Sequence, residues 1–278
     1  MKKVAVIGIV GRSVFLSVDA FHTGGETVPA HGVREEYGGK GFNAAVAAAR
    51  AGASVSFLSA VGEKECADIA AFLEKEGIDA HLCPKKEATA FAAILTDRVG
   101  ANRVTVYEGA RLTVPDADAF SKAIRNADIL LLNNETPEEV NLAAAWVARA
   151  AGVPVILNPA PARPLSPELR ERISLFTPNE FECAGLEAYR NVIETRGSRG
   201  CYLRESGKSI PATRGKAVDT TGAGDTFNGV LAAMLAEGAD LETAAQAAVR
   251  ASGISVTRPG AVSSIPYRIE WKGEEEHG

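Results

Sequence analysis

The sequence predicts an α/β fold in which a mostly parallel sheet lies between layers of helices. Two observations predict it: apolar strands alternate with helical segments along the middle of the chain, and the first strand, Val4–Ile7, is an unbroken apolar run that ends at a glycine. Strands buried on both faces have such runs. Repeated strand–helix–strand units imply parallel neighbours with helices on both faces. Ligands of such sheets bind at the carboxyl ends of the strands.

The composition narrows the possible functions. The chain has 278 residues and a net charge of −5, with 46 % hydrophobic and 23 % charged residues. These values are typical of a soluble globular protein, and the acidic balance disfavours nucleic acids and anionic membranes as partners. The N-terminal apolar run is too short for a signal peptide, and no stretch reaches the ~20 apolar residues of a membrane helix. Four widely spaced cysteines favour reduced thiols in a cytoplasmic protein.

The expected elements follow the alternation of apolar and polar residues. We expect strands at 54–60, 91–96, 103–107, 129–132, 154–157, 175–177 and 191–195, and helices at 42–51, 67–76, 116–126 and 137–151. Two hairpin-like segments, 13–36 and 89–108, do not fit the strand–helix pattern, and we expect them to form a small antiparallel lid. The predicted organisation is one domain over residues 1–270, followed by an acidic tail at 271–278.

The segment Asp219–Gly229 is the most informative motif. Its residues Gly222 to Asp225 directly precede apolar residues at helical spacing, which are Phe227, Val230, Leu231, Met234 and Leu235. The glycines therefore lie at the first turn of a helix, where free N–H groups and the helix dipole attract an anion such as phosphate. Asp225 would lie beside this anion and could take a proton from an attacking hydroxyl. Alternatively, the glycines form only a tight turn and Asp225 is a helix-start acid.

A second glycine motif, Gly38–Ala45, also precedes a helix. Lys40 and Asn43 could bind the hydroxyls of a polyol, and the glycines leave room for a ligand. The motif is not a Walker loop, because that pattern needs Gly, four residues and then Gly-Lys-Ser/Thr, and it is not Gly-x-Gly-x-x-Gly. Taken alone, it could also be a structural turn.

Together, these segments resemble the two signature regions of the PfkB sugar-kinase family, and those of ribokinases most closely. Four further segments match in the same order, at 158–163, 177–182, 195–200 and 255–261. The resemblance is collinear from about residue 2 to residue 266. It implies a ribokinase-like three-layer α/β/α fold with a β-sheet lid. It also implies an ATP-dependent kinase that phosphorylates the primary hydroxyl of a sugar, in ribokinases D-ribose to ribose 5-phosphate.

The resemblance also implies roles for individual residues. The catalytic base would be Asp225, beside an anion hole formed by Gly222, Ala223 and Gly224. The sugar would be bound by Gly11, Ser13, Gly39, Lys40, Gly41, Asn43 and Glu135, with Asp225. The nucleotide and its Mg²⁺ would be bound by Asn179, Glu182, Thr195, Gly197, Ser198, Gly200 and Gly224. A monovalent cation, K⁺ by the resemblance, would be held by Asp219, Thr221, Ser255, Arg258, Gly260 and Ser264. A homodimer paired through the lid is also implied.

Three of these residues have an alternative explanation in the sequence. Glu135 could cap the helix expected from residue 137, and Glu182 could be a solvated acid at the start of a helix. Arg258 is more simply structural, because the resemblance there concerns its backbone.

The sequence departs from the family at two places. In ribokinases, the turn after the first strand carries an Asn and, two residues on, an Asp that binds sugar hydroxyls, whereas this sequence has Gly11 and Ser13 with Arg12 between them. The substrate could therefore be another sugar or nucleoside, such as a fructose-type sugar or a keto-sugar acid. The segment between Glu182 and Thr195 is also short, which predicts a missing helix and looser nucleotide binding. A non-catalytic sugar or nucleotide sensor is the remaining alternative.

Overall fold

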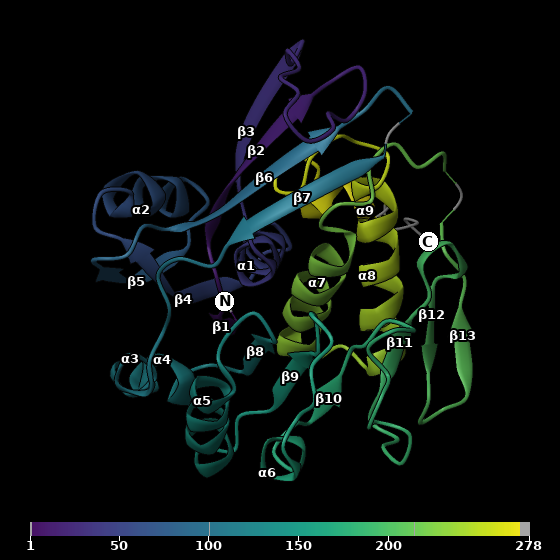
Figure 1. The fold of residues 1–278 in the computed structure, drawn as a ribbon. Coiled ribbons are helices and arrows are strands. Elements are labelled where there is room, and N and C mark those ends of the chain that lie inside the picture. Colours follow the sequence, from purple (N-terminus) through teal and green to yellow (C-terminus); the bar gives the residue numbers. More distant parts are fainter. Residues whose placement is uncertain (1, 100, 214, 273–278) are drawn as a thin grey trace.

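A parallel sheet forms the centre of the molecule. The computed structural model describes residues 2–99, 101–213 and 215–272. Its central sheet has six strands in the order β10-β9-β8-β1-β4-β5, and all neighbours are parallel (Figure 1). In that order, the strands span Leu175–Phe176, Val155–Asn158, Ile129–Asn133, Lys3–Ile7, Ser54–Gly62 and Asp79–Lys85. The predicted fold class is confirmed.

Helices cover both faces of this sheet. One hydrophobic core lies between the sheet and a layer formed by α1 (Lys40–Arg50), α2 (Cys66–Lys75), α7 (Ala223–Glu237), α8 (Leu241–Ser255) and α9 (Arg268–Trp271). A second core lies on the opposite face, under α3 (Val114–Ala119), α4 (Ser121–Arg125), α5 (Glu138–Ala150) and α6 (Pro167–Arg170). This arrangement makes three layers, α/β/α.

Small residues bring α1 and α7 into close contact. A Cβ atom added to Gly229 of α7 would lie 2.2 Å from the carbonyl oxygen of Ala44 in α1. At the first turn of α1, a Cβ on Gly41 would lie 2.5 Å from the Cα of Gly8, which follows β1. Since neither contact leaves room for a side chain, these glycines allow the first turns of α1 and α7 to meet at the carboxyl end of β1.

A second sheet stands apart from the central one, above the first turns of α1 and α7 (Figure 1). Its strands are ordered β3-β2-β6-β7, spanning Gly32–Gly38, Gly11–Ser17, Ala90–Thr96 and Asn102–Tyr107. These strands come from the two segments that did not fit the strand–helix alternation. The expectation of an antiparallel sheet is wrong in one respect, because the central pair β2–β6 is parallel and the sheet is therefore mixed.

A third sheet lies beside α8; one of its strands was expected, at 191–195, but the sheet itself was not. It is antiparallel, with strands β11 (Ile193–Thr195), β12 (Cys201–Leu203) and β13 (Lys208–Ile210). The strands are three residues long, which is too short for a clear alternation of apolar and polar residues. Strand β5 and helices α6, α8 and α9 were also not predicted.

Two further expectations need correction. The helix predicted at 116–126 is two short helices, α3 and α4, which meet at Phe120 because that residue ends one and caps the next. Trp271, assigned from sequence to the acidic tail, is the last residue of α9, and its side chain is buried in the core. The remaining tail residues, 273–278, lie outside the described part. No helix of the described residues is long and apolar enough to cross a membrane.

Candidate active site

Asp225 lies in the first turn of α7. The helix is capped by Gly222, whose φ of +74° is a backbone conformation that favours glycine. The side chain of Asp225 is almost completely buried, and its Oδ2 accepts a hydrogen bond of 2.7 Å from Nδ2 of Asn43 in α1. Nζ of Lys40, the first residue of α1, lies 4.0 Å from Oδ1 of Asp225. The contact between α1 and α7 therefore brings together three predicted site residues that are distant in the sequence.

The electrostatics of this group suit proton transfer. Burial raises the pKa of Asp225, and the charge of Lys40 and the hydrogen bond from Asn43 oppose the rise. A carboxylate with a raised pKa is a stronger base than one in water. The charge of Asp225 in turn raises the pKa of Lys40, which therefore stays protonated. The opposite atom of the Asn43 amide, Oδ1, is buried without a hydrogen-bond partner and is free to accept one from a ligand hydroxyl.

Glu135 joins the same group from the end of β8. Its Oε2 accepts a hydrogen bond of 2.7 Å from the backbone N–H of Lys40, so it satisfies the first amide of α1. The alternative that Glu135 caps the helix expected from residue 137 is wrong, because α5 is capped at Pro137 without any side-chain bond. Burial and the nearby charge of Asp225 raise the pKa of Glu135 to about 7, against the opposing effect of Lys40.

A cavity of ≈ 790 Å³ opens between the second sheet and this group, and we call it the second-sheet cavity. Four of the residues predicted to bind the sugar line it: Gly11, Ser13, Gly39 and Glu135. Lys40, Gly41 and Asn43 follow Gly39 along α1. The glycines have a structural role in addition, since Gly39 has a φ of +108° and a Cβ there would lie 2.4 Å from the carbonyl oxygen of Ile9.

A second cavity, of ≈ 730 Å³, is lined by Gly224, the neighbour of Asp225, and by residues of α8; we call it the α7–α8 cavity. All but one of the residues predicted to bind the nucleotide line it, namely Asn179, Thr195, Gly197, Ser198, Gly200 and Gly224. Gly224 and Asp225 are adjacent, as are Gly39 and Lys40. The Lys40–Asp225 pair therefore lies between the two cavities. A group that acts on one molecule in each cavity would need this position.

Part of the α7–α8 cavity was missed from sequence. Its wall includes residues of α8, the residue that caps the C-terminus of that helix and residues of the segment before α7, namely Val249, Ser252, Gly253, Val256, Ala212, Thr213, Gly215 and Ala217. A Cβ on Gly253 would lie 1.7 Å from Oγ1 of Thr213, so the two segments touch. A glycine within the alanine-rich sequence of α8 was the one available signal of this close approach.

Glu182 is the remaining residue predicted to bind the nucleotide, and Asn179 fixes its side chain. Its carboxylate accepts hydrogen bonds from the backbone N–H and the side-chain amide of Asn179, at 2.9 and 2.7 Å. The alternative that Glu182 is an acid at a helix start is wrong, because the residues that follow form turns. Its carboxylate is thereby held at the edge of the α7–α8 cavity, beside Asn179.

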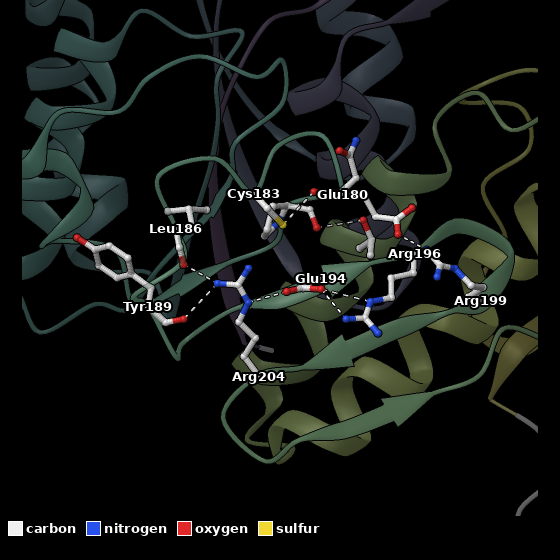
Figure 2. Close-up of polar contacts among 11 residues, drawn as sticks. Glu180, Cys183, Leu186, Tyr189, Glu194, Arg196, Arg199 and Arg204 are labelled. Carbon is white, nitrogen blue, oxygen red and sulfur yellow. Dashed lines mark hydrogen bonds and ion pairs between the residues drawn. The ribbon is translucent and has the colours of Figure 1, made fainter.

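The short segment after Glu182 has no helix among its described residues, as its length predicts, but it is not loose. Arg204, directly after β12, donates to the carbonyl oxygens of Leu186 and Tyr189 in this segment (Figure 2). Nε of Arg204 also donates to Glu194 of β11 across 2.6 Å, and Glu194 accepts a second bond from Arg196. Although burial disfavours its charged form, these bonds lower the pKa of Glu194 and keep it ionised.

The residues predicted to hold a monovalent cation are only partly brought together. Asp219 accepts hydrogen bonds from the backbone N–H and hydroxyl of Thr221 and from the backbone N–H of Gly260. Burial disfavours its charge, but these bonds lower the pKa of Asp219 below its usual value. Ser255 and Ser264 are buried, and their hydroxyls donate to backbone carbonyls. The side chain of Arg258 pairs with Glu270, so only its backbone could take part, as expected.

Comparison with known proteins identifies the family. The pattern of the pfkB family carbohydrate kinase matches residues 1–268. The chain belongs to the PfkB carbohydrate kinase family. A ribokinase from Haemophilus influenzae is 36 % identical to it, with 99 % of each chain covered. A ribokinase structure from Thermotoga maritima has a TM-score of 0.88 at 32 % identity, covering 98 % of each chain.

A further PfkB relative was solved with ligands. It is the ribokinase of Arabidopsis thaliana, complexed with ribose and ATP, with a TM-score of 0.85 at 26 % identity and 99 % of each chain covered. Membership of this family makes the chain a phosphotransferase with a hydroxyl acceptor, in agreement with the expectation from its motifs.

Proposed function

We propose that this PfkB kinase transfers the γ-phosphoryl group of ATP to the primary hydroxyl of D-ribose. The observation that carries the proposal is the position of Asp225, buried at the first turn of α7. Its neighbour Gly224 lines one cavity, and its ionic partner Lys40 follows Gly39, which lines the other. The ribokinases of Haemophilus influenzae and Thermotoga maritima, similar over nearly the whole chain, support a sugar in the second-sheet cavity. The Arabidopsis thaliana ribokinase, complexed with ribose and ATP, supports both substrates.

In the proposed reaction, Asp225 removes the proton of the attacking hydroxyl, which attacks the γ-phosphorus as the bond to ADP breaks. The proton passes to a carboxylate oxygen of Asp225. The N–H groups at the start of α7, around Gly222, Ala223 and Gly224, stabilise the negative charge on the transferred group. Lys40 lies between the two cavities and adds positive charge near the same oxygens. Asn43 orients Asp225 through its Nδ2 and binds a sugar hydroxyl through Oδ1.

We propose that Mg²⁺ is bound through the phosphates and water. Among the described residues, no group of three or more His, Cys, Asp or Glu is arranged to hold a metal ion. This agrees with the usual binding of Mg²⁺, which keeps several waters and contacts one or two carboxylates. The carboxylate of Glu182 fits this role, since Asn179 occupies only part of its acceptor capacity. When bound, Mg²⁺ would neutralise charge on the phosphates during transfer.

A monovalent cation is proposed for the loop beside Gly222. Asp219 and Gly260 are already in contact there, and the hydroxyls of Ser255 and Ser264 donate to carbonyls, which leaves their oxygen lone pairs free to bind a cation. K⁺ is the ion that the family resemblance favours. The proposal predicts higher activity in KCl than in tetramethylammonium chloride at equal ionic strength. Equal activity in the two salts would contradict it.

A second candidate is a kinase for another sugar or nucleoside. It is favoured by Gly11 and Ser13, which line the second-sheet cavity in place of the amide and carboxylate of ribokinases. The deciding experiment is a substrate panel of ribose, a fructose-type sugar, a keto-sugar acid and a nucleoside, with ADP release as the readout. A clear preference for ribose supports the first proposal, and a preference for another member supports the second. No turnover with any member would contradict both.

The protein is proposed to be a cytoplasmic homodimer. Cys66, Cys83, Cys183 and Cys201 are free thiols, in keeping with a reducing compartment. The occupant proposed for the outer edge of the second sheet is another copy of this chain. Within the described part of the chain, strand β7 pairs only with β6, and all six of its residues are exposed, including the apolar Val104 and Val106. An exposed edge strand of this kind favours pairing. Light scattering that gives a monomer mass would contradict this proposal.

A further inference from the structure

Glu36 connects the second sheet to the loop 259–264 near the C-terminus. Its Oε1 accepts a hydrogen bond of 3.0 Å from the backbone N–H of Ala261, and its Oε2 one of 3.3 Å from the hydroxyl of Ser263. Nη1 of Arg34, on the same strand, lies 2.5 Å from Oε1 of Glu36. The side chain of Glu36 is only 11 % exposed. A carboxylate so enclosed, with three donors, holds its partners in one arrangement.

The loop that Glu36 holds is also held from the opposite side. The backbone N–H of Gly260, next to Ala261, donates to Oδ2 of Asp219 across 2.9 Å. Ala261 in turn packs against the residue that caps α7, since a Cβ on Gly222 would lie 3.3 Å from the Cα of Ala261. Two consecutive amides of the loop are therefore fixed by two carboxylates, and the loop supports the first turn of α7.

The strand that carries Glu36, β3, forms part of the wall of the second-sheet cavity through Gly38. Within the pair β2–β3, Glu36 lies opposite Ser13, and Gly38 lies opposite Gly11. Ser13, Gly11 and Gly38 all line the cavity. Residues directly opposite in an antiparallel pair point to the same face of the sheet. A change in the position of these strands on sugar binding would therefore move Glu36.

We propose that Glu36 is a positioning residue, which couples the strands of the second-sheet cavity to the anion-binding turn of α7 through Ala261. The inference rests on the proposed function, because it assigns the two ends to the sugar and to the phosphoryl group. When the sugar fixes β2 and β3, Glu36 fixes Ala261, and Ala261 keeps Gly222 in place for the transferred group. Displacement of catalytic groups by ~1 Å is enough to slow a reaction strongly.

The test compares Glu36→Ala, Glu36→Gln and the wild type. In Glu36→Ala, kcat with the best sugar should fall about tenfold or more, while the Kd of the sugar from calorimetry changes less than about threefold. Glu36→Gln keeps an oxygen for the N–H of Ala261 and should recover part of the loss. The control is Asp19→Ala, which removes an exposed ion pair with Arg98 beyond the end of β2 and should leave kcat unchanged.

A second measurement needs no catalysis. In the protein without ligands, Glu36→Ala should speed hydrogen exchange at the amide of Ala261, and Asp19→Ala should not. Unchanged exchange at Ala261, or a folded Glu36→Ala with a kcat within about twofold of the wild type, overturns the inference. A wild type that phosphorylates no sugar contradicts the proposed function instead, and the exchange at Ala261 then still decides whether Glu36 holds the loop.

Discussion

The side-chain amide of Asn43 donates to the carboxylate of Asp225 across 2.7 Å, and so ties the first turn of α1 to the first turn of α7. The two residues are 182 positions apart in the chain. Each cavity has part of its wall next to this bond, Gly39 on one side and Gly224 on the other. The bond therefore fixes the distance between the sugar and nucleotide ends of the proposed site.

Replacing Asp225 by Asn should abolish activity without loss of folding. An amide oxygen at 225 still accepts the bond from Asn43, but the side chain can no longer take a proton. We expect kcat to fall about 10³-fold, while the melting temperature stays equal or rises because a buried charge is removed. Coupled ADP release and thermal melting check both expectations. As a control, Asp240→Asn changes the exposed cap of α8 and should keep kcat. Near-normal turnover of Asp225→Asn would show that another group is the base.

Glu135 should make the stability depend on pH below neutrality. Burial, then the charge of Asp225, raise the pKa of Glu135 from 4.5 to about 7 in the folded protein. The folded state therefore holds a proton that the unfolded chain releases near 4.5, and the stability due to this proton is complete below 4.5 and lost as the pH rises towards 7. Glu135→Gln should flatten the fall of the melting temperature over this range. The exposed Glu139→Gln should keep the wild-type slope, and equal slopes in all three proteins would contradict the prediction.

Ser13→Asp tests why this chain lacks the carboxylate found in ribokinases. Since Ser13 and Glu36 are direct neighbours across β2 and β3, two carboxylates would face each other. Such a pair should lower the free energy of unfolding by roughly 0.2–1 kcal/mol. The double variant Ser13→Asp, Glu36→Gln should recover this loss of stability, and its kcat/KM for ribose should be higher than that of Glu36→Gln alone. The control Ser17→Asp adds the same charge opposite Gly32 and should give no coupling with Glu36→Gln. If the effects of Ser13→Asp and Glu36→Gln on the free energy of unfolding simply add, the prediction is contradicted.

The features that the sequence predicted are local. The glycines before α1 and α7 and the apolar spacing that follows them are read from neighbouring residues, so both helix starts and the parallel core strands were expected. Contacts between distant segments were not. The parallel pairing of β2 with β6, the use of Glu135 to cap α1 and the contribution of α8 to a cavity all depend on packing of the whole chain. The bonds of Glu36 to the loop 259–264 are of the same kind, since either segment alone reads as ordinary polar sequence.

Arg204→Ala should weaken nucleotide binding while sparing the sugar. Arg204 fixes two carbonyls of the helix-free segment that leads from Glu182 to Thr195, and Glu194, its partner, is adjacent to Thr195 (Figure 2). Thr195 is also paired with Asn179, so loss of the arginine should loosen both residues at the wall of the α7–α8 cavity.

The expected result for Arg204→Ala is a rise of about three- to tenfold in the KM for ATP, with the KM for the sugar unchanged. Arg204→Lys keeps the charge beside Glu194 but not the fork that reaches the carbonyls, and should be intermediate. The matched control is Arg190→Ala, which removes a single bond to the carbonyl of Glu205 at the surface. A rise in both KM values would show general loosening of the fold. If neither KM changes, the segment is held in place without Arg204. Leu186 and Val192, which are buried in the core, would then be enough to hold it.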